Sequence, residues 1–175
     1  METPVTLRKD LYQLVVEWEI LHKPKTFPLF DRHVSDCPHT LVLLQDPGPS
    51  ADAKEWAAIL NQDDTAWELK RLALLVHAEE NLQHVLVWNT IPWRRSGGAI
   101  TLGELNEAKP FHAELIALLR PHLKRILLMG DAAHRLLPFL SGITPGVAIR
   151  GGHHTGRKAR QSFRVEENEA LFHAL

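Results

Sequence analysis

Leu41-Val42-Leu43-Leu44-Gln45-Asp46-Pro47-Gly48 is the stretch that decides the fold of this chain. Four consecutive apolar residues indicate a buried strand, and Pro-Gly cannot continue a sheet, so the chain must turn directly after Asp46. In α/β sheets, chemistry usually gathers at the carboxyl ends of the strands. Asp46 is therefore a candidate functional carboxylate. The alternative is a strand-to-helix turn in which Asp46 only caps backbone amides, and the stretch taken alone favours that alternative.

Three further apolar runs predict strands, so that strands are expected over residues 40–45, 84–89, 125–129 and 147–149. The segments between them have helical spacing, and we expect helices over residues 7–21, 52–60, 65–80, 104–119, 131–139 and 165–174. Strands that alternate with helices favour a parallel sheet with helices on both faces. The predicted fold class is α/β, a three-layer αβα sandwich with a short, mainly parallel four-stranded sheet.

Length and composition narrow the class of protein. The 175 residues predict a single domain over residues 1–175, and the net charge of -1 excludes a uniformly basic DNA-coating protein but allows a local basic patch. No apolar run is long enough to span a membrane, and the first residues lack the regions of a signal peptide, so we expect a cytoplasmic protein. Cys37 is the single cysteine, which excludes an intramolecular disulfide and a multi-cysteine zinc or iron–sulfur site.

Polar residues follow each predicted strand and should meet at one edge of the sheet. They are Asp46, Asn89, the pair Gly130-Asp131, and the run His153-His154-Thr155. Each has a structural alternative: Asn89 could cap the loop after it, Gly130-Asp131 could be a tight turn with a helix N-cap, and one of the two histidines could be a loop residue. The adjacent histidines could also bind a metal, but no third ligand has helpful spacing, so no metal or cofactor is expected. Five other histidines lie on helical patterns and are predicted to be surface residues: His22, His77, His112, His122 and His134.

The combination of Asp46, Asn89 and His153 suits cleavage of an N-glycosidic bond. A carboxylate at the sugar can stabilise positive charge at the anomeric carbon and position the attacking water, and an imidazole can donate a hydrogen bond to the departing base. An Asn amide offers one donor face and one acceptor, and so can pair with both edge groups of a pyrimidine.

With these residues in place, the chain resembles the uracil-DNA glycosylase superfamily. Gln45-Asp46-Pro47 is similar to the water-activating motif of the branch that carries Gln-Asp-Pro-Tyr-His, whereas Gly48 resembles the Asn-Pro-Gly form of the mismatch-specific and single-strand-selective branches. The longest similarity is to the thermostable iron–sulfur branch, over Asn89–Arg94 and Leu118–Pro121 and on to Gly130, and His153–Gly156 stands where the superfamily has His-Pro-Ser or Asn-Pro-Ser-Gly.

The departures from the family pattern bear on what the resemblance implies. Trp93 and Lys109 occupy the positions of two cluster cysteines, so no iron–sulfur cluster is expected. His154 replaces the usual Pro and Thr155 the usual Ser, which loosens the third motif. Gly48 lacks the Tyr side chain that would reject the methyl group of thymine, so the resemblance implies a choice of base broader than uracil.

The resemblance implies a role for each matching residue. Asp46 and His153 would be catalytic, the first orienting water and the second stabilising the leaving base, and Asn89 would read the pyrimidine edge. Gln45, Gly48 and Thr155 would complete the base pocket. Arg157 stands where relatives insert a wedge side chain into the duplex to help flip the target nucleotide. A basic rim would hold the DNA backbone: Arg94, Arg95, Arg150, Arg157, Lys158 and Arg160. For Arg94 and Arg95, a solvated charged loop is an equal alternative. Trp56 and Trp88 are candidates for a base-stacking aromatic, although core positions are the expectation for both.

Two hypotheses follow. The first is a DNA glycosylase that excises uracil or a related deaminated base in base excision repair, a nucleoid-associated monomer whose partner is DNA and which needs no cofactor. The second is a catalytically impaired nucleic-acid-binding protein of the same fold, which the altered His153-His154-Thr155 motif favours. A serine hydrolase and a dinucleotide-binding protein are disfavoured because their Gly-x-Ser-x-Gly and glycine-rich motifs are missing.

Overall fold

The computed structural model describes residues 6–31, 33–47, 56–57, 68–72, 79–153 and 162–173. Its centre is a four-stranded sheet of β2 (Thr40–Leu44), β4 (Val85–Asn89), β5 (Arg125–Met129) and β6 (Ala148–Gly152). The strands lie in the order β4-β2-β5-β6, and every neighbouring pair is parallel. The predicted α/β class and the parallel four-stranded sheet are confirmed.

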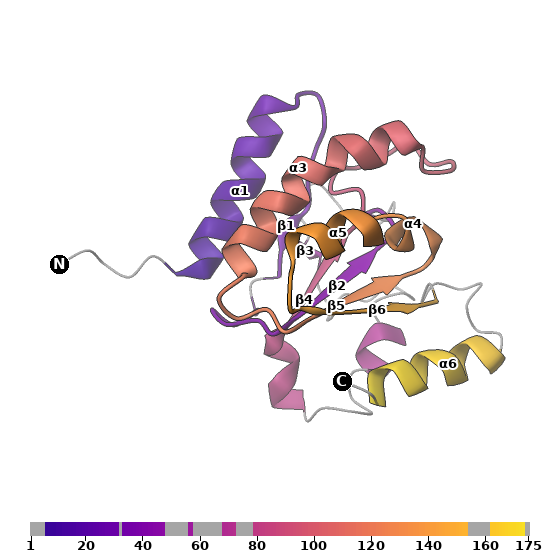
Figure 1. Ribbon diagram of the computed structural model, residues 1–175. Helices are drawn as coiled ribbons and strands as arrows, with labels where there is room; N and C mark the ends of the chain where they lie inside the picture. Colours follow the sequence, from indigo (N-terminus) through magenta and orange to yellow (C-terminus); the bar gives the residue numbers. More distant parts are fainter. Residues whose placement is uncertain are drawn as a thin grey trace.

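Helices cover both faces of this sheet (Figure 1). One face packs against α1 (Leu7–Leu21), α3 (Leu102–Leu119), α4 (Asp131–His134) and α5 (Leu137–Ile143). The other face packs against α6 (Ser162–His173), the 3-10 helix η1 (Glu79–His84) and a helical segment at residues 68–72. The result is a three-layer sandwich.

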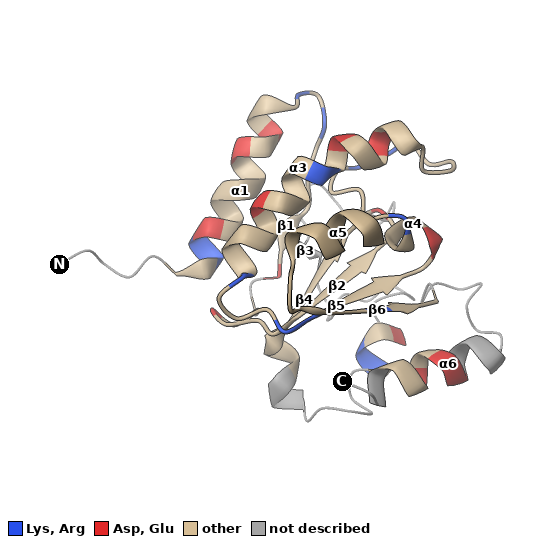
Figure 2. Cartoon of the chain, viewed as in Figure 1, with Lys and Arg blue, Asp and Glu red and all other residues tan. Residues whose placement is uncertain are grey.

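Alternation along the strands explains why there are two separate cores. Successive side chains of a strand point to opposite faces. In β2, Leu41 and Leu43 belong to the larger core beneath α1 and α3, whereas Val42 belongs to the smaller core beneath α6. Strands buried on both faces need apolar residues at every position, which is why these runs are continuous in the sequence. Figure 2 shows most charged residues on the helices and loops; β2 and β4 carry none, while β5 begins with Arg125 and β6 contains Arg150.

An aromatic stack fills the larger core. The Trp88 ring lies between Phe30, at a centroid distance of 3.7 Å, and Phe111, at 5.8 Å. Trp88 is fully buried, so its predicted core role is confirmed. Trp56 cannot be assigned in the same way because its side chain lies outside the described part of the structure.

Several predicted elements are corrected by the structure. Within the predicted helix 52–60, Trp56–Ala57 is instead a short strand, β3, which pairs in parallel with β1 (Leu29–Phe30). The other residues of 52–60 lie outside the described residues. The predicted helix 131–139 is two helices, α4 and α5, with Pro138 in the first turn of α5, where a missing backbone N–H is tolerated. Of the helix predicted over 65–80, the described residues 68–72 are helical. Its last two residues belong to the 3-10 helix η1, which continues to residue 84.

Candidate active site at the carboxyl edge of the sheet

The register of the strands sets which predicted site residues become neighbours. Leu44 of β2 pairs with Asn89 of β4, so Asp46 leaves the sheet beside Asn89. On the other side, Met129 of β5 pairs with Gly152 of β6, which places His153 beside Gly130. Parallel strands lie about 4.8 Å apart, so His153, two strands from β2, leaves the sheet about 10 Å from it. The edge thus presents an amide, a carboxylate and an imidazole in one row.

Asp46 is held by a buried arginine. Nη1 of Arg95 lies 3.0 Å from Oδ2 of Asp46, and the Arg95 side chain is only 6% exposed. The same guanidinium donates to Glu104 from Nε at 2.7 Å and to the carbonyls of Gly98 and Ala99. Two carboxylates on one guanidinium form a strong, geometrically fixed network, and they raise the pKa of Arg95 although burial opposes this. Asp46 is therefore fixed in direction.

Glu104 connects this network to the start of α3. The Thr101 hydroxyl accepts from the backbone N of Glu104 at 3.2 Å, while the Glu104 carboxylate accepts from the backbone N of Thr101 at 2.8 Å, which makes a capping box. The Arg95 guanidinium and the Thr101 amide lower the pKa of Glu104 to about 2. The spacing Thr101-x-x-Glu104 is visible in the sequence and would have placed the start of this helix at 102 rather than 104; the link from Glu104 to Asp46 has no sequence signal.

Arg95 and Arg94 do not lie in the solvated loop that was one expectation for them. Arg95 is buried in the network above, and Nε and Nη2 of Arg94 are buried with no hydrogen-bond partner within the described structure. The backbone N of Arg94 donates to Thr26 at 2.9 Å, which fixes the loop against the segment after α1. A phosphate contact by Arg95 would have to compete with two carboxylates. The solvated-loop interpretation is wrong because these side chains pack inward.

Asn89 ends β4 as a largely buried residue. The whole residue is 6% exposed, and its amide has no hydrogen bond to any of the described residues; the amide atoms are not among the fully buried atoms without a partner, so they stay partly accessible. A loop-capping role would require such a bond, so the capping alternative finds no support in the described contacts. The amide retains both its donors and its acceptor for a bound molecule.

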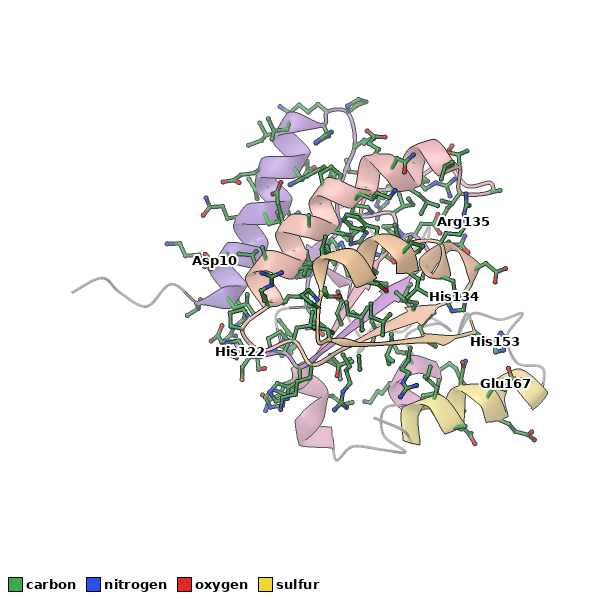
Figure 3. The ribbon with its side chains drawn as sticks, in the orientation of Figure 1. Asp10, His122, His134, Arg135, His153 and Glu167 are labelled. Atoms are coloured by element: carbon green, nitrogen blue, oxygen red, sulfur yellow. The ribbon has the colours of Figure 1, made fainter. Side chains whose placement is uncertain are left out.

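His153 is held by α6, the last helix of the chain, which carries Glu167 beside it (Figure 3). Its backbone N donates to Oδ1 of Asn168 at 2.8 Å, the Asn168 amide donates back to the His153 carbonyl at 3.2 Å, and the ring Nε2 pairs with the Glu167 carboxylate. Gly152 is needed here, because a Cβ at that position would lie 2.7 Å from Leu171 and 2.9 Å from Asn168. Sequence reasoning missed Glu167 and Asn168, which no motif marks.

His112 corrects a prediction made from helical spacing. It lies on α3 as expected, but it is fully buried rather than on the surface, and its Nε2 pairs with the Thr90 carbonyl at 2.8 Å. Burial lowers its pKa to about 4, so the ring is neutral at physiological pH. Thr90 in turn donates from its hydroxyl to the Leu44 carbonyl at 2.5 Å. His112 therefore supports the loop that follows Asn89.

The other predicted site residues divide into two groups. Gln45 is half-buried, and its carbonyl accepts from the backbone N of Ile91 at 3.1 Å, which joins the turn after β2 to the loop after β4. Gly130 is the N-cap of α4 with φ of 94°, and Asp131 opens that helix, so the structural interpretation of this pair holds. Five of the predicted residues lie outside the described structure: Gly48, Thr155, Arg157, Lys158 and Arg160.

Comparison with known proteins bears on the fold. Neither a family model nor a curated protein matches the sequence. The structure is similar to the solution NMR structure of a putative uracil DNA glycosylase from Methanosarcina acetivorans, with a TM-score of 0.52 and 20% sequence identity over 81% of this chain and 93% of that chain. At this identity the similarity establishes a shared α/β fold. Since one fold can carry many activities, function must be argued from the site.

Proposed function

We propose that this protein is a DNA glycosylase that hydrolyses the N-glycosidic bond of uracil or a related deaminated base. The observation that carries the proposal is the row of side chains at the carboxyl edge, with Asp46 and Asn89 on adjacent strands and His153 on the far side of Gly130. The shared fold with the structure of a putative uracil DNA glycosylase supports it. The proposed partner is DNA. Among the described residues, no helix is long and apolar enough to cross a membrane.

The reaction needs negative charge at the sugar and a donor at the base. As the bond between the anomeric carbon and the base nitrogen breaks, the electron pair leaves with the base and positive charge develops on the sugar. Asp46 stabilises that charge and orients a water, which adds to the anomeric carbon and passes its proton to the Asp46 carboxylate. Arg95 keeps the carboxylate in one orientation at 3.0 Å, so little reorganisation is needed when the charge develops.

Asn89 selects the base. Its amide, without a bond to the described residues, can pair with the carbonyl and the adjacent N–H of a pyrimidine edge. A base that lacked these groups would leave the amide unpaired, which makes such a pocket far more selective than shape alone.

His153 stabilises the leaving base. The Glu167 carboxylate pairs with its Nε2 and fixes the ring orientation, as carboxylates do for catalytic and metal-bound imidazoles. Since Nε2 pairs with Glu167, the hydrogen bond to the base oxygen has to come from Nδ1 of a ring that carries a proton on both nitrogens; it would stabilise the negative charge that the base carries away. Glu167 and Asn168 are thus positioning residues in this mechanism.

One contact favours the second candidate function, a nucleic-acid-binding protein with impaired catalysis. The Arg95 guanidinium lies against Oδ2 of Asp46 and neutralises part of the charge that the reaction uses. Such a protein would retain DNA binding and lose base excision.

An excision assay separates the two candidates. Single-stranded and duplex oligonucleotides that contain uracil, hypoxanthine or xanthine are incubated with the protein, and abasic sites are then cleaved with alkali. We expect strand breaks with the wild-type protein that disappear in Asp46→Asn and in His153→Ala. Asp131→Asn is the matched control, because Asp131 is an exposed carboxylate at the next strand end, and it should retain activity. DNA binding without strand breaks in the wild-type protein would overturn the glycosylase proposal and favour the binding protein.

The wedge role of Arg157 can be tested in the same assay. Flipping a base out of a duplex costs a few kcal/mol, and less when the base is already single-stranded. Arg157→Ala should therefore reduce excision from duplex DNA more than from single strands. Equal losses on both substrates would count against a wedge.

A further inference from the structure

A cysteine and two histidines meet at the amino edge of the sheet, opposite the candidate active site. Cys37 and His39 precede β2, and His84 ends η1 immediately before β4. Because Thr40 pairs with Val85, the residues one step earlier, His39 and His84, are also neighbours. The backbone N of His39 donates to the His84 carbonyl at 2.9 Å, and their rings are stacked at 4.8 Å with an interplanar angle of 5°.

Cys37, His39 and His84 offer three ligand atoms in one place. An imidazole binds a metal through a lone pair in the plane of its ring, and the two rings are parallel, so one ring has to rotate when both bind the same ion. One ligand atom from each of Cys37, His39 and His84 lies within 4.8 Å of the other two, and all three residues are half-buried. Sγ of Cys37 lies 3.9 Å from Nδ1 of His84. The same Nδ1 lies 3.1 Å from the Cys37 carbonyl oxygen, which can only accept, so Nδ1 carries the ring proton and Nε2 is the His84 nitrogen with a lone pair for a metal.

The donor types select the metal. A thiolate and two imidazoles suit a borderline transition-metal ion, whereas Mg²⁺ and Ca²⁺ take oxygen ligands. Three protein ligands leave a fourth position for water. Ser35 forms part of the outer shell: its hydroxyl lies 2.9 Å from Nδ1 of His84 and accepts from the backbone N of Cys37 at 3.3 Å.

The charges around the cluster require the thiolate. Lys124 and Arg125 lie close enough to His39 to act on it electrostatically. The same Lys and Arg side chains repel a dication, and the thiolate of Cys37 supplies the compensating negative charge. Loss of the thiol should therefore weaken binding more than loss of one imidazole.

We propose that Cys37, His39 and His84 form a zinc-binding site that ties the loop before β2 to the start of β4. Strands of five residues are about 16 Å long, so this site is remote from Asp46 and Asn89. The site is independent of the proposed glycosylase activity.

Cobalt replaces zinc in the first test, because it reports which atom binds it. Full-length protein is titrated with Co²⁺ in a phosphine reductant. We expect one Co²⁺ per chain, with tetrahedral visible bands and a thiolate-to-cobalt charge-transfer band that Zn²⁺ abolishes. Since Cys37 is the single cysteine among the 175 residues, a charge-transfer band can come only from Cys37.

Three variants complete the test. Cys37→Ser should lose the charge-transfer band, and its zinc affinity should fall by more than the 10- to 100-fold, roughly, that loss of an outer-shell partner costs. His39→Ala should weaken binding less; its ring has no hydrogen bond in the described structure, so the fold should survive. His22→Ala is the control for adventitious binding by the eleven histidines, because His22 stacks on Trp18 of α1 and should leave affinity unchanged.

Thermal unfolding gives an independent readout on the wild-type protein. One equivalent of Zn²⁺ should raise the Tm of the wild-type protein, and EDTA should reverse the rise. Cys37→Ser should show no zinc-dependent change in Tm, and a cooperative unfolding transition will show that this variant is folded. Absence of a charge-transfer band in the folded wild-type protein would overturn the proposal, as would equal zinc affinity of wild type and Cys37→Ser.

Discussion

The two edges of the same sheet carry different kinds of chemistry. At the carboxyl edge, Asp46, Asn89 and His153 come from three strand ends and are held by residues far away in the chain, Arg95 and Glu167. At the amino edge, Cys37, His39 and His84 come from the segments entering two adjacent strands, and the pairing of those strands brings them together. The comparison shows that the pairing of parallel strands brings polar side chains together at both edges of the sheet. Ion pairs with residues from other elements then fix the orientation of the side chains at the carboxyl edge.

The largest effect is expected at the carboxyl edge, where replacement of Asn89 should abolish most base recognition and leave the free energy of unfolding almost unchanged. Asn89→Ala should reduce excision about 100-fold, a typical loss for one positioned hydrogen-bonding group. Its free energy of unfolding should stay the same or rise slightly, because the amide has no bond to the described residues. Excision kinetics and urea unfolding of the same preparation check both expectations. A large stability loss would mean that Asn89 has a structural role instead.

Removal of Arg95 should be the largest stability effect at the carboxyl edge. Arg95→Met leaves Asp46 and Glu104 without their cation, and we expect a loss of about 2 kcal/mol in the free energy of unfolding. Excision should fall too, since the carboxylate loses its fixed orientation. Lys9→Met removes an exposed cation from α1 and is the control. If Arg95→Met and Lys9→Met lowered the free energy of unfolding by the same small amount, the ion pairs of Arg95 would not be what holds Asp46.

A smaller effect should appear in the pH dependence of stability. The folded-state pKa of Glu104 is lowered to about 2 from 4.5, so its contribution to stability is fully present above the unfolded value and is lost as pH falls from 4.5 toward 2. Glu104→Gln can still form the capping box but lacks the charge, and its stability should fall less over this range. Urea unfolding at several acidic pH values measures the difference, with the exposed Glu166→Gln as control. Parallel curves for wild type and Glu104→Gln would contradict the expectation.

The smallest expected effect is the test of independence between the edges. Cys37→Ser should leave the excision rate unchanged in the absence of added metal, because about 16 Å of sheet separates Cys37 from the carboxyl edge. A clear loss of excision in a folded Cys37→Ser protein would show that the two edges are coupled and would break the comparison.

Sequence patterns were sufficient where the physics is local. Helix α1 was predicted with its observed bounds, Leu7–Leu21, and so was β5, Arg125–Met129, because continuous apolar runs and helical spacing follow from burial on one or both faces. The predicted helix over 52–60 is wrong at Trp56–Ala57, because strand pairing with Leu29–Phe30 overrides local propensity. The prediction that His112 is a surface residue is wrong. Helical spacing shows which residues share a face of a helix, but not how deeply a neighbouring loop buries that face.

The sequence by itself determined the parallel sheet and the places at which Asp46, Asn89 and His153 leave it, since alternation of apolar strands and helices leaves few other arrangements. Only the tertiary structure decided what surrounds those residues. Arg95 turns inward to Asp46 instead of outward to solvent, α6 brings Glu167 to His153, and strand register brings His84 to Cys37 and His39. These contacts join residues 14 to 49 positions apart, and such separations carry no local periodicity from which pairing could be predicted.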